Sequence, residues 1–175
     1  MKMKFTILSV LCIVLVSCSK TGELPYIPQN MLRNGNFEDE SLLDELWLPE
    51  GEGYSISNTE DFYEGVRSLE LGATTCRGME YEDVLYAEAG KTYELSFAIK
   101  MPGTPTGCAG EFVVSILQGD EEILYFNISP PTAENWNIQK YYITTESEMP
   151  LTLEFIVGMD KLLLDDMQLK EMVEL

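Results

Sequence analysis

The stretch that decides the fold is Met31-Leu32-Arg33-Asn34-Gly35-Asn36-Phe37-Glu38-Asp39. Leu32 and Phe37 supply apolar anchors, and Asn34-Gly35 allows the positive φ that a sharp bend requires. The pattern predicts the opening strand of a small all-β domain, with the Glu38 carboxylate directly after a buried aromatic ring. An acid next to a buried position must be paired, hydrogen-bonded or bound to a cation.

A second acidic stretch, Leu162 to Leu169 (LLLDDMQL), predicts the closing strand of the domain. Asp165 shares the alternation of Met167 and Leu169, which we expect to face inward, so its charge most needs compensation. We therefore expect the first and last strands to lie side by side and to share a Ca²⁺ ion between their acids.

The residues between these stretches alternate between apolar and polar side chains, as in strands with one buried face. The clearest is Thr92 to Lys100, in which Tyr93, Leu95, Phe97 and Ile99 face one way. Glu40 to Leu48 is interpreted as a loop or short turn that leads into a strand, with a helical turn as the alternative. Further strands are predicted at 46–48, 54–57, 66–71, 79–87, 111–118, 122–128, 136–144 and 151–157. Nine or ten short strands predict an antiparallel β-sandwich.

The first residues have the features of an export signal. Lys2 and Lys4 precede an apolar run, Phe5 to Val16, that is too short for a permanent membrane helix. Leu15-Val16-Ser17-Cys18 then resembles the lipobox of bacterial lipoproteins, in which Cys18 is lipidated; an ordinary signal peptide or an uncleaved anchor is the alternative. We predict a signal peptide at 1–17, a tether at 18–29, the folded domain at 30–170 and a tail at 171–175. Ser19 is compatible with sorting to the outer membrane of the cell envelope.

Charge and composition exclude several functions. The net charge is −19, and it becomes −21 once Lys2 and Lys4 are removed with the signal peptide. Such a surface repels phosphate backbones, so nucleic acid is not expected as a partner. No histidine is present, which excludes Ser-His-Asp and Cys-His catalysis and imidazole zinc sites. Cys76 and Cys108 are left after lipidation, and in an oxidising compartment we expect them to form a disulfide.

The order of the motifs resembles a known family. NMLRNGNFED, a nearby tryptophan, YEGVRSLEL, EAGKTYELSFAIK, W-x5-Y and LLLDDMQL follow one another as in the carbohydrate-binding modules of families four, nine and twenty-two. The resemblance covers about residues 30–170 and implies a galactose-binding-like jelly roll. It also implies a structural Ca²⁺ between the first and last strands. By position, Glu38 and Asp165 match the metal-binding acids, with Asp166 as a substitute. The alternative is that both acids accept backbone N–H groups or pair with Arg67.

Sugar recognition requires flat rings that stack on pyranose faces and polar groups that bond hydroxyls. We predict a neutral oligo- or polysaccharide as the ligand, held without cleavage. The alternative is that the chain is a cell-surface adhesin or an accessory lipoprotein that binds a protein partner. A glycoside hydrolase would need a carboxylate pair, for which Glu80 with Glu82, or the acids at 120–122, are candidates. The predicted ligand-binding residues are Trp47, Tyr54, Arg77, Tyr81, Tyr86 and Gln118.

Overall fold

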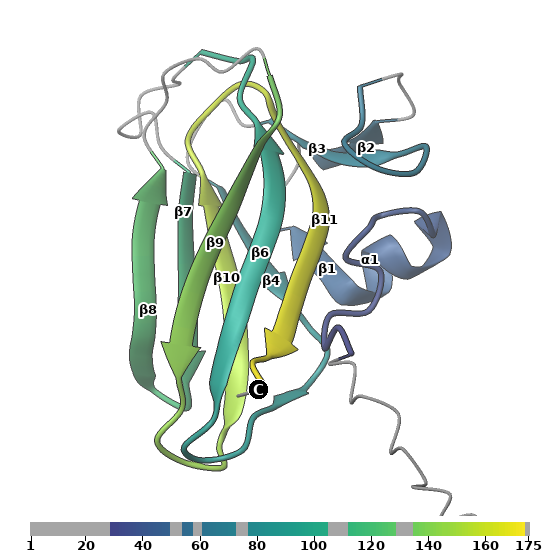
Figure 1. The fold of residues 1–175 in the computed structure, drawn as a ribbon. Coiled ribbons are helices and arrows are strands. Elements are labelled where there is room, and N and C mark those ends of the chain that lie inside the picture. Colours follow the sequence, from purple (N-terminus) through teal and green to yellow (C-terminus); the bar gives the residue numbers. More distant parts are fainter. Residues whose placement is uncertain are drawn as a thin grey trace, which may run out of the picture.

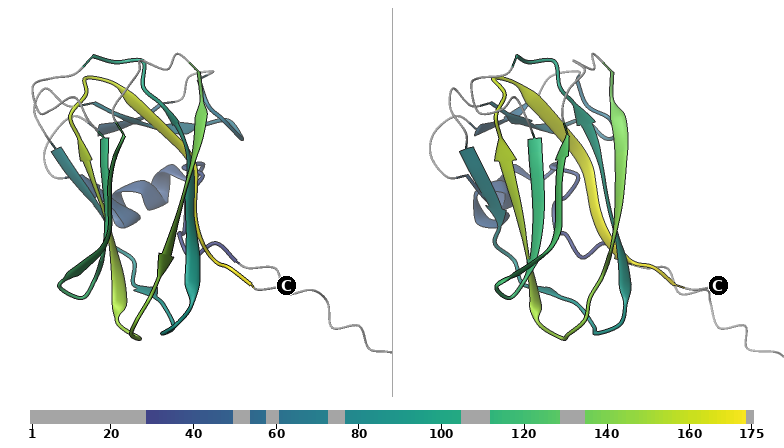
Figure 2. Two further views of the ribbon diagram at one scale, coloured as in Figure 1. Left: turned by 60° about the vertical axis from the view of Figure 1, so that its left-hand side comes forward. Right: turned by 90° about the vertical axis from the view of Figure 1, so that its left-hand side faces the viewer.

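The computed structural model describes residues 29–49, 54–57, 61–72, 77–104, 112–128 and 135–173. In this part of the chain eleven strands form two antiparallel sheets that pack face to face (Figures 1 and 2). The prediction of an all-β antiparallel sandwich is confirmed. No helix among the described residues is long and apolar enough to cross a membrane.

Each sheet contains five strands in one hydrogen-bonded path, and the first sheet has one extra short strand. Sheet A has the order β1 (Trp47–Pro49), β4 (Arg77–Tyr81), β10 (Pro150–Val157), β7 (Phe112–Gln118) and β8 (Glu121–Ile128), with β5 (Leu85–Tyr86) also paired to β10. Sheet B has the order β2 (Tyr54–Ser57), β3 (Ser68–Leu71), β11 (Leu162–Glu171), β6 (Thr92–Lys100) and β9 (Asn137–Thr144).

The core between the sheets is built from one face of each strand. Tyr93, Leu95, Phe97 and Ile99 of β6 are all buried, as their alternation predicts. Aromatic rings run through this core in a connected series whose neighbouring centroids lie 4.8 to 6.1 Å apart: Tyr81, Trp47, Phe155, Phe112 and Phe97. Burial of these large rings is a main source of the stability of the domain.

The free edges of the two sheets meet at β8 and β9, which lie on the same side of the sandwich (Figure 1). Phe126 of β8 and Tyr141 of β9 stack across this gap, with ring centroids 3.4 Å apart and an interplanar angle of 12°. Phe97 lies behind both rings at 6.3 to 6.4 Å. The open side of the sandwich is therefore closed by side chains.

The opening stretch is not a strand, so that part of the prediction is wrong. Residues 31–36 form bends and turns in which Asn34 takes a φ of 52°. The predicted proximity is nevertheless confirmed, because Met31 N–H donates to the Leu169 carbonyl and Met167 N–H donates to the Gly35 carbonyl, both at 2.8 Å. Gly35 is required for this approach, since a Cβ there would lie 2.1 Å from the Met167 carbonyl oxygen.

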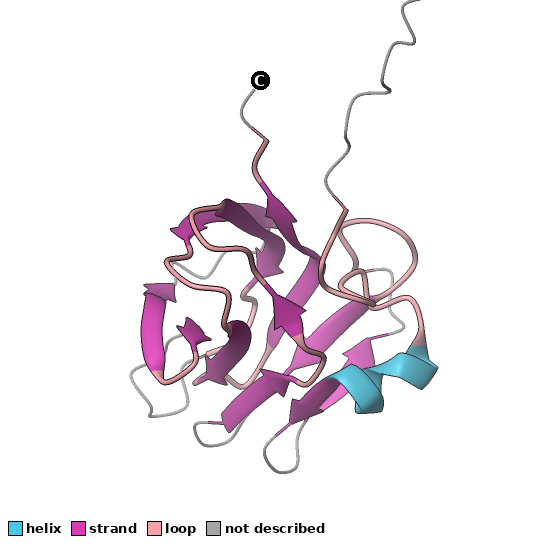
Figure 3. Ribbon diagram, turned by 90° about the horizontal axis from the view of Figure 1, so that it is seen from below, coloured by secondary structure: helices cyan, strands magenta, loops and turns pink. Residues whose placement is uncertain are grey.

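Two short helical segments follow the opening stretch, η1 (Glu40–Leu42) and the one-turn helix α1 (Leu43–Leu46). The helical turn that the sequence allowed as an alternative is therefore the form that occurs. Figure 3 shows both segments at one edge of the sandwich. Asp39 caps η1 by accepting the Ser41 N–H at 2.9 Å.

Candidate functional site

Glu38 and Asp165 hold the same loop, residues 61–67, although they lie far apart in sequence. Glu38 Oε1 accepts the backbone N–H groups of Val66 and Arg67 at 2.7 and 3.1 Å. Asp165 Oδ2 accepts those of Tyr63 and Glu64 at 2.8 and 3.0 Å. We call this arrangement the carboxylate clamp. It matches the alternative in which the two acids accept backbone N–H groups.

Asp165 is fully buried, yet it does not face the core as its alternation suggested. In β11, Leu164 pairs with the inward-facing Ile99, and Asp165 pairs with Ala98 on the outer face of sheet B. A register shift then follows, at which Asp166 has a φ of 45°, and this shift brings Met167 and Leu169 inward. Burial raises the pKa of Asp165, although the N–H groups of Glu64, Tyr63 and Asp166 act in the opposite direction.

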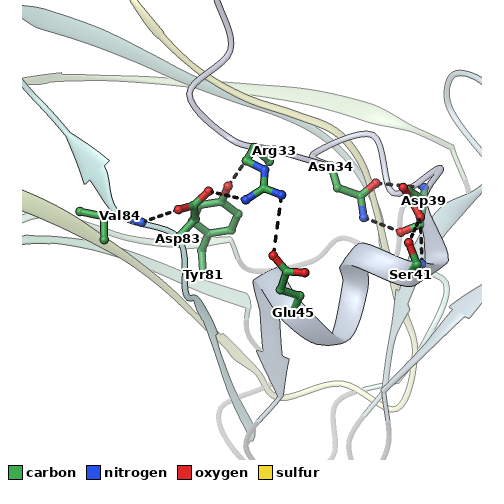
Figure 4. Close-up of polar contacts among 8 residues, drawn as sticks. All are labelled: Arg33, Asn34, Asp39, Ser41, Glu45, Tyr81, Asp83 and Val84. Atoms are coloured by element: carbon green, nitrogen blue, oxygen red, sulfur yellow. Dashed lines mark hydrogen bonds and ion pairs between the residues drawn. The ribbon is translucent and has the colours of Figure 1, made fainter.

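The opening stretch that carries Glu38 is fixed by its own polar contacts (Figure 4). The Asn34 side-chain amide donates to the Asp39 carbonyl at 2.8 Å, and its oxygen accepts the Asp39 N–H at 3.0 Å. Arg33 lies between two acids, with Asp83 at 3.1 Å and Glu45 at 3.7 Å. Its backbone N–H donates to the Tyr81 hydroxyl at 2.7 Å. These contacts hold Glu38 in reach of the 61–67 loop.

A pocket of about 370 Å³ lies beside the clamp. It is lined by Asn36, Glu38, Glu64, Gly65, Asp166 and Gln168. Carboxylate and amide oxygens are the ligands that Ca²⁺ prefers, so the residue types fit this ion. As they lie, however, the described residues contain no group of three or more acidic or cysteine side chains placed to hold a metal. The Ca²⁺ site therefore stays a prediction.

Three predicted ligand-binding residues are buried, and these predictions need correction. Trp47 is 1% exposed and packs against Phe37 and Tyr81 in the core. Tyr81 is 2% exposed, and its hydroxyl serves the backbone of Arg33. Gln118 is 6% exposed and donates to the Ser147 carbonyl at 2.7 Å. All three side chains stabilise the fold away from any surface that a glycan can reach.

The other predicted residues have different outcomes. Tyr86 of β5 is 73% exposed and lines a pocket of about 520 Å³ together with Tyr93 and Glu171. Its role as a ligand contact stays a prediction. The side chains of Tyr54 and Arg77 lie outside the described part of the structure, as do Cys18, Cys76 and Cys108.

The outer face of sheet A carries a row of side chains that crosses all five strands of the path. Its members are directly paired in register: Leu48, Glu80, Glu154, Ser115 and Tyr125. Strands lie about 4.8 Å apart, so the row extends over roughly 19 Å. We call it the sheet A row. Its two ends are apolar or aromatic, and its centre is polar.

The centre of this face is more shielded than its ends. Leu48 and Tyr125 are 39% and 57% exposed at the two ends, whereas Ser115 in the centre is 8% exposed. In the neighbouring row, Val113 is likewise 8% exposed beside an exposed Ile156. Ser115 Oγ donates to Glu122 at 3.1 Å, which adds a third acid to this face.

Comparisons with solved structures identify the architecture. TmCBM61, solved in complex with β-1,4-galactotriose, superposes with a TM-score of 0.62 and 13% identity, covering 81% of this chain and 97% of that chain. The fold is that of a carbohydrate-binding module. The second family 16 carbohydrate-binding module gives a TM-score of 0.59 and 21% identity, covering 83% of this chain and all of the other. No protein-family model matches the sequence, and no curated protein matches it.

The carbohydrate-binding-module fold also occurs within enzymes. The enzymatically active domain of tailspike protein 4 of bacteriophage CBA120 matches with a TM-score of 0.58 and 14% identity, but the match covers only 21% of that chain. Identities this low establish the shared fold and leave the chemistry of each face to its own residues.

Sequence reasoning missed the sheet A row because no short motif marks it. Its members come from five strands, and only the pairing register brings Glu80 opposite Glu154 and Ser115 opposite Tyr125. One signal was available: each member alternates with a buried apolar neighbour, such as Trp47 beside Leu48 or Phe155 beside Glu154. The strand order needed to join them was not readable from the chain.

Proposed function

We propose that this protein is a non-catalytic glycan-binding protein that holds a neutral oligosaccharide on the outer face of sheet A. The observation that carries the proposal is the sheet A row. Apolar and aromatic groups at its ends suit the flat faces of sugar rings, and the carboxylates at its centre can accept hydrogen bonds from sugar hydroxyls. The fold shared with carbohydrate-binding modules supports the same assignment.

The charge of this face argues for a neutral ligand. Glu122 and Glu154 lie on it, and none of its described side chains is basic. An anionic polysaccharide would place its charges beside these carboxylates, in addition to the net charge of −19. Sugar hydroxyls instead donate to carboxylates without bringing any charge.

The proposed location is the bacterial cell envelope, with a lipid on Cys18 as the anchor and the outer membrane as the expected site. The lipobox-like sequence at 15–18 supports this proposal. Anchoring many copies on one surface would make even weak binding to a repetitive glycan effective. Labelling cells with a radioactive fatty acid tests it: label in the wild-type protein should disappear in Cys18→Ser.

A glycan array with the full chain tests the binding proposal, followed by titration of each hit. Tyr125→Ala and Glu154→Gln should each weaken binding by about tenfold or more. Ile138→Ala, which removes a side chain that is 53% exposed on β9 of sheet B, is the matched control and should leave affinity unchanged. Uniformly blank wells would favour a protein partner instead. Equal affinity in all three variants would place the ligand elsewhere.

A second candidate function rests on one observation, the direct pairing of Glu80 and Glu154 across β4 and β10. Carboxylates on facing positions of neighbouring strands are close enough to act as a pair in glycoside hydrolysis. Release of reducing sugar from a bound glycan, lost in Glu154→Gln, would establish hydrolysis. Stable binding with no new reducing ends would support the non-catalytic role.

We also propose that Ca²⁺ binds in the pocket beside the carboxylate clamp. The oxygen-rich lining formed by Glu38, Glu64 and Asp166 supports the proposal. A bound ion raises apparent stability by mass action, so the melting temperature should be higher in Ca²⁺ than in chelator, and this difference should shrink in Asp166→Ala. Equal melting temperatures in Ca²⁺ and in chelator would mean that the N–H groups of the 61–67 loop compensate the two acids without a metal ion.

A further inference from the structure

A third pocket lies at the end of the sandwich where β6 begins and where β9 and β11 end. It has a volume of about 520 Å³ and is lined by Gly90, Lys91, Thr92, Tyr142, Glu171, Met172 and Val173. We call it the Tyr142 pocket. Its residues come from sheet B, from the turn before β6 and from the two residues after β11, so it is separate from the sheet A row. None of them belongs to the carboxylate clamp.

The ring of Tyr142 is exposed but held in place. It is 57% exposed, and its hydroxyl donates to Glu94 Oε2 at 2.9 Å. The other Glu94 oxygen accepts from Lys140 Nζ at 2.8 Å, and this contact lowers the pKa of Glu94. Glu94 in turn raises the pKa of Tyr142, so the hydroxyl stays a donor. A ring fixed at its polar end loses little freedom when a ligand stacks on it.

The charged groups of the pocket are already engaged in ion pairs, because Lys91 contacts Glu171 and also lies 3.9 Å from Glu88 Oε2. Lys91 Nζ lies 2.7 Å from Glu171 Oε1, and the two side chains keep 43% and 23% exposure. The Thr92 and Thr144 hydroxyls are 3.0 Å apart at the neighbouring register position. The pocket therefore offers ammonium and hydroxyl donors next to carboxylate and hydroxyl acceptors, with no unpaired charge on Lys91 or Glu171.

We propose that the Tyr142 pocket is a second carbohydrate subsite, which binds one neutral pyranose ring. The ring stacks on Tyr142, and two neighbouring sugar hydroxyls bond to the Lys91–Glu171 pair, one accepting from the ammonium and one donating to the carboxylate. A carboxylated or an aminated sugar would compete with one member of the ion pair and leave the other without its partner. This preference for a neutral ring follows from the pair itself. It stands independently of the sheet A row.

Amide chemical-shift mapping on the ¹⁵N-labelled full chain tests the proposal. The probe is methyl β-D-galactopyranoside, added up to about 50 mM because a single ring is expected to bind with a roughly millimolar Kd. Methyl β-D-glucopyranoside, D-galacturonate and D-glucosamine serve as comparisons. We expect saturable shifts at residues 90–92, 142 and 171–173 with the two neutral glycosides, and at least about tenfold weaker binding of the two charged sugars.

Two variants give the readout its specificity. Tyr142→Ala should abolish the shifts at residues 90–92 and 171–173, and Lys91→Gln should weaken them while leaving the stacking ring in place. Tyr125→Ala, on the opposite sheet, should leave them unchanged. If Tyr142→Ala lowers the melting temperature, its loss of shifts can reflect altered folding, and the proposal is then judged from Lys91→Gln alone.

The failures of the two proposals are distinguishable. Absence of shifts at residues 90–92 and 171–173 with both neutral glycosides overturns the Tyr142 subsite, as do shifts there that persist in both Tyr142→Ala and Lys91→Gln. Equal affinity for charged and neutral sugars overturns the assigned ligand class. Shifts confined to strands of sheet A would support only the sheet A row.

Discussion

Gly35, Gly65 and Gly90 occupy three different environments, although the same residue type stands at each. A Cβ at Gly35 would lie 2.1 Å from a backbone oxygen of β11, and a Cβ at Gly65 would lie 2.0 Å from Glu38 Oε1. At Gly90 no atom lies within 4 Å. Gly65 and Gly90 share a φ near 75°, which only glycine adopts without strain.

These environments predict a graded loss of stability in alanine variants. Gly90→Ala should lower the free energy of unfolding by about 1 kcal/mol, the cost of the left-handed backbone alone. Gly35→Ala should lower it by at least about 2 kcal/mol more, because a backbone atom of β11 must move. The loss in Gly65→Ala should lie between these two values, because the Glu38 side chain can adopt another rotamer. Urea denaturation measures all three, and a reversed order would contradict the close approach at Gly35.

Asp165 should contribute strongly to stability through the carboxylate clamp. Asp165→Ala leaves the N–H groups of Tyr63 and Glu64 without their acceptor, so we expect a loss of about 3 kcal/mol in the free energy of unfolding. The matched control is Asp120→Ala, an exposed turn position, which should change it by less than about 0.5 kcal/mol. Similar losses in both variants would mean that the clamp contributes little.

Tyr81 provides a pH-dependent prediction. Burial raises its pKa above the ordinary value of 10.0. Above that pH the unfolded chain loses the phenolic proton while the folded chain keeps it. The contribution of Tyr81 to the free energy of unfolding is therefore constant below about pH 10 and falls as the pH rises further. Tyr81→Phe should lose about 1 kcal/mol at neutral pH and show a shallower alkaline decline. Urea denaturation from pH 8 to pH 11 measures both, and parallel curves would contradict this assignment.

Sequence reasoning brought Glu38 and Asp165 together but gave the wrong orientation for Asp165. Glu38 and Asp165 were singled out because charge beside apolar residues requires compensation, and the structure places both on the 61–67 loop. The inward orientation of Asp165 failed because the alternation of side chains was extended across an unseen register shift. Such a shift depends on how β11 pairs with β6, which one strand's sequence does not contain.

At the scale of elements, β8 and β9 are edge strands of different sheets, so no ladder of backbone hydrogen bonds joins them in the described part of the chain. Side chains such as Phe126 and Tyr141 make the contact between them. Phe126→Ala removes the Phe126–Tyr141 stack and should cost about 2 kcal/mol. Amide exchange in β8 and β9 should accelerate more than in the central strands β10 and β11. Tyr125→Ala, the adjacent residue on the outer face, is the control. Uniform acceleration through all strands would mean that the edge does not open separately.

The strands were predictable to the extent that they alternate. β6 occupies the predicted range of 92–100, and β2, β7, β9 and β10 agree within a residue at either end. The range 79–87 divides into β4 and β5 instead, because residues 82–84 leave the sheet after Tyr81. The positive φ of Asn34 agrees with the bend that Asn34-Gly35 predicts, but the opening stretch forms turns rather than a strand, and no alternation pattern reveals the positive φ at Phe37.

The whole molecule carries a net charge of −19, and self-repulsion of that size destabilises the compact state. Salt screens such repulsion over a Debye length of about 10 Å at 0.1 M. Raising sodium chloride from 10 to 200 mM, with chelator throughout, should increase the melting temperature by about 2–4 °C, equivalent to about 1 kcal/mol. A melting temperature that falls with salt would indicate that attractive ion pairs outweigh the repulsion.

Gln29 and Glu171 line the same pocket, so the described chain enters and leaves the sandwich at one pole (Figure 1). Attachment of the protein to a sensor chip or bead next to residue 29 or residue 173 would therefore turn this pole toward the support. Tyr142 lines a pocket with Met172 and Val173 at that pole, whereas the sheet A row extends along the side of the molecule. If both proposed sugar sites are correct, immobilised and free protein should therefore bind different numbers of sugars per chain.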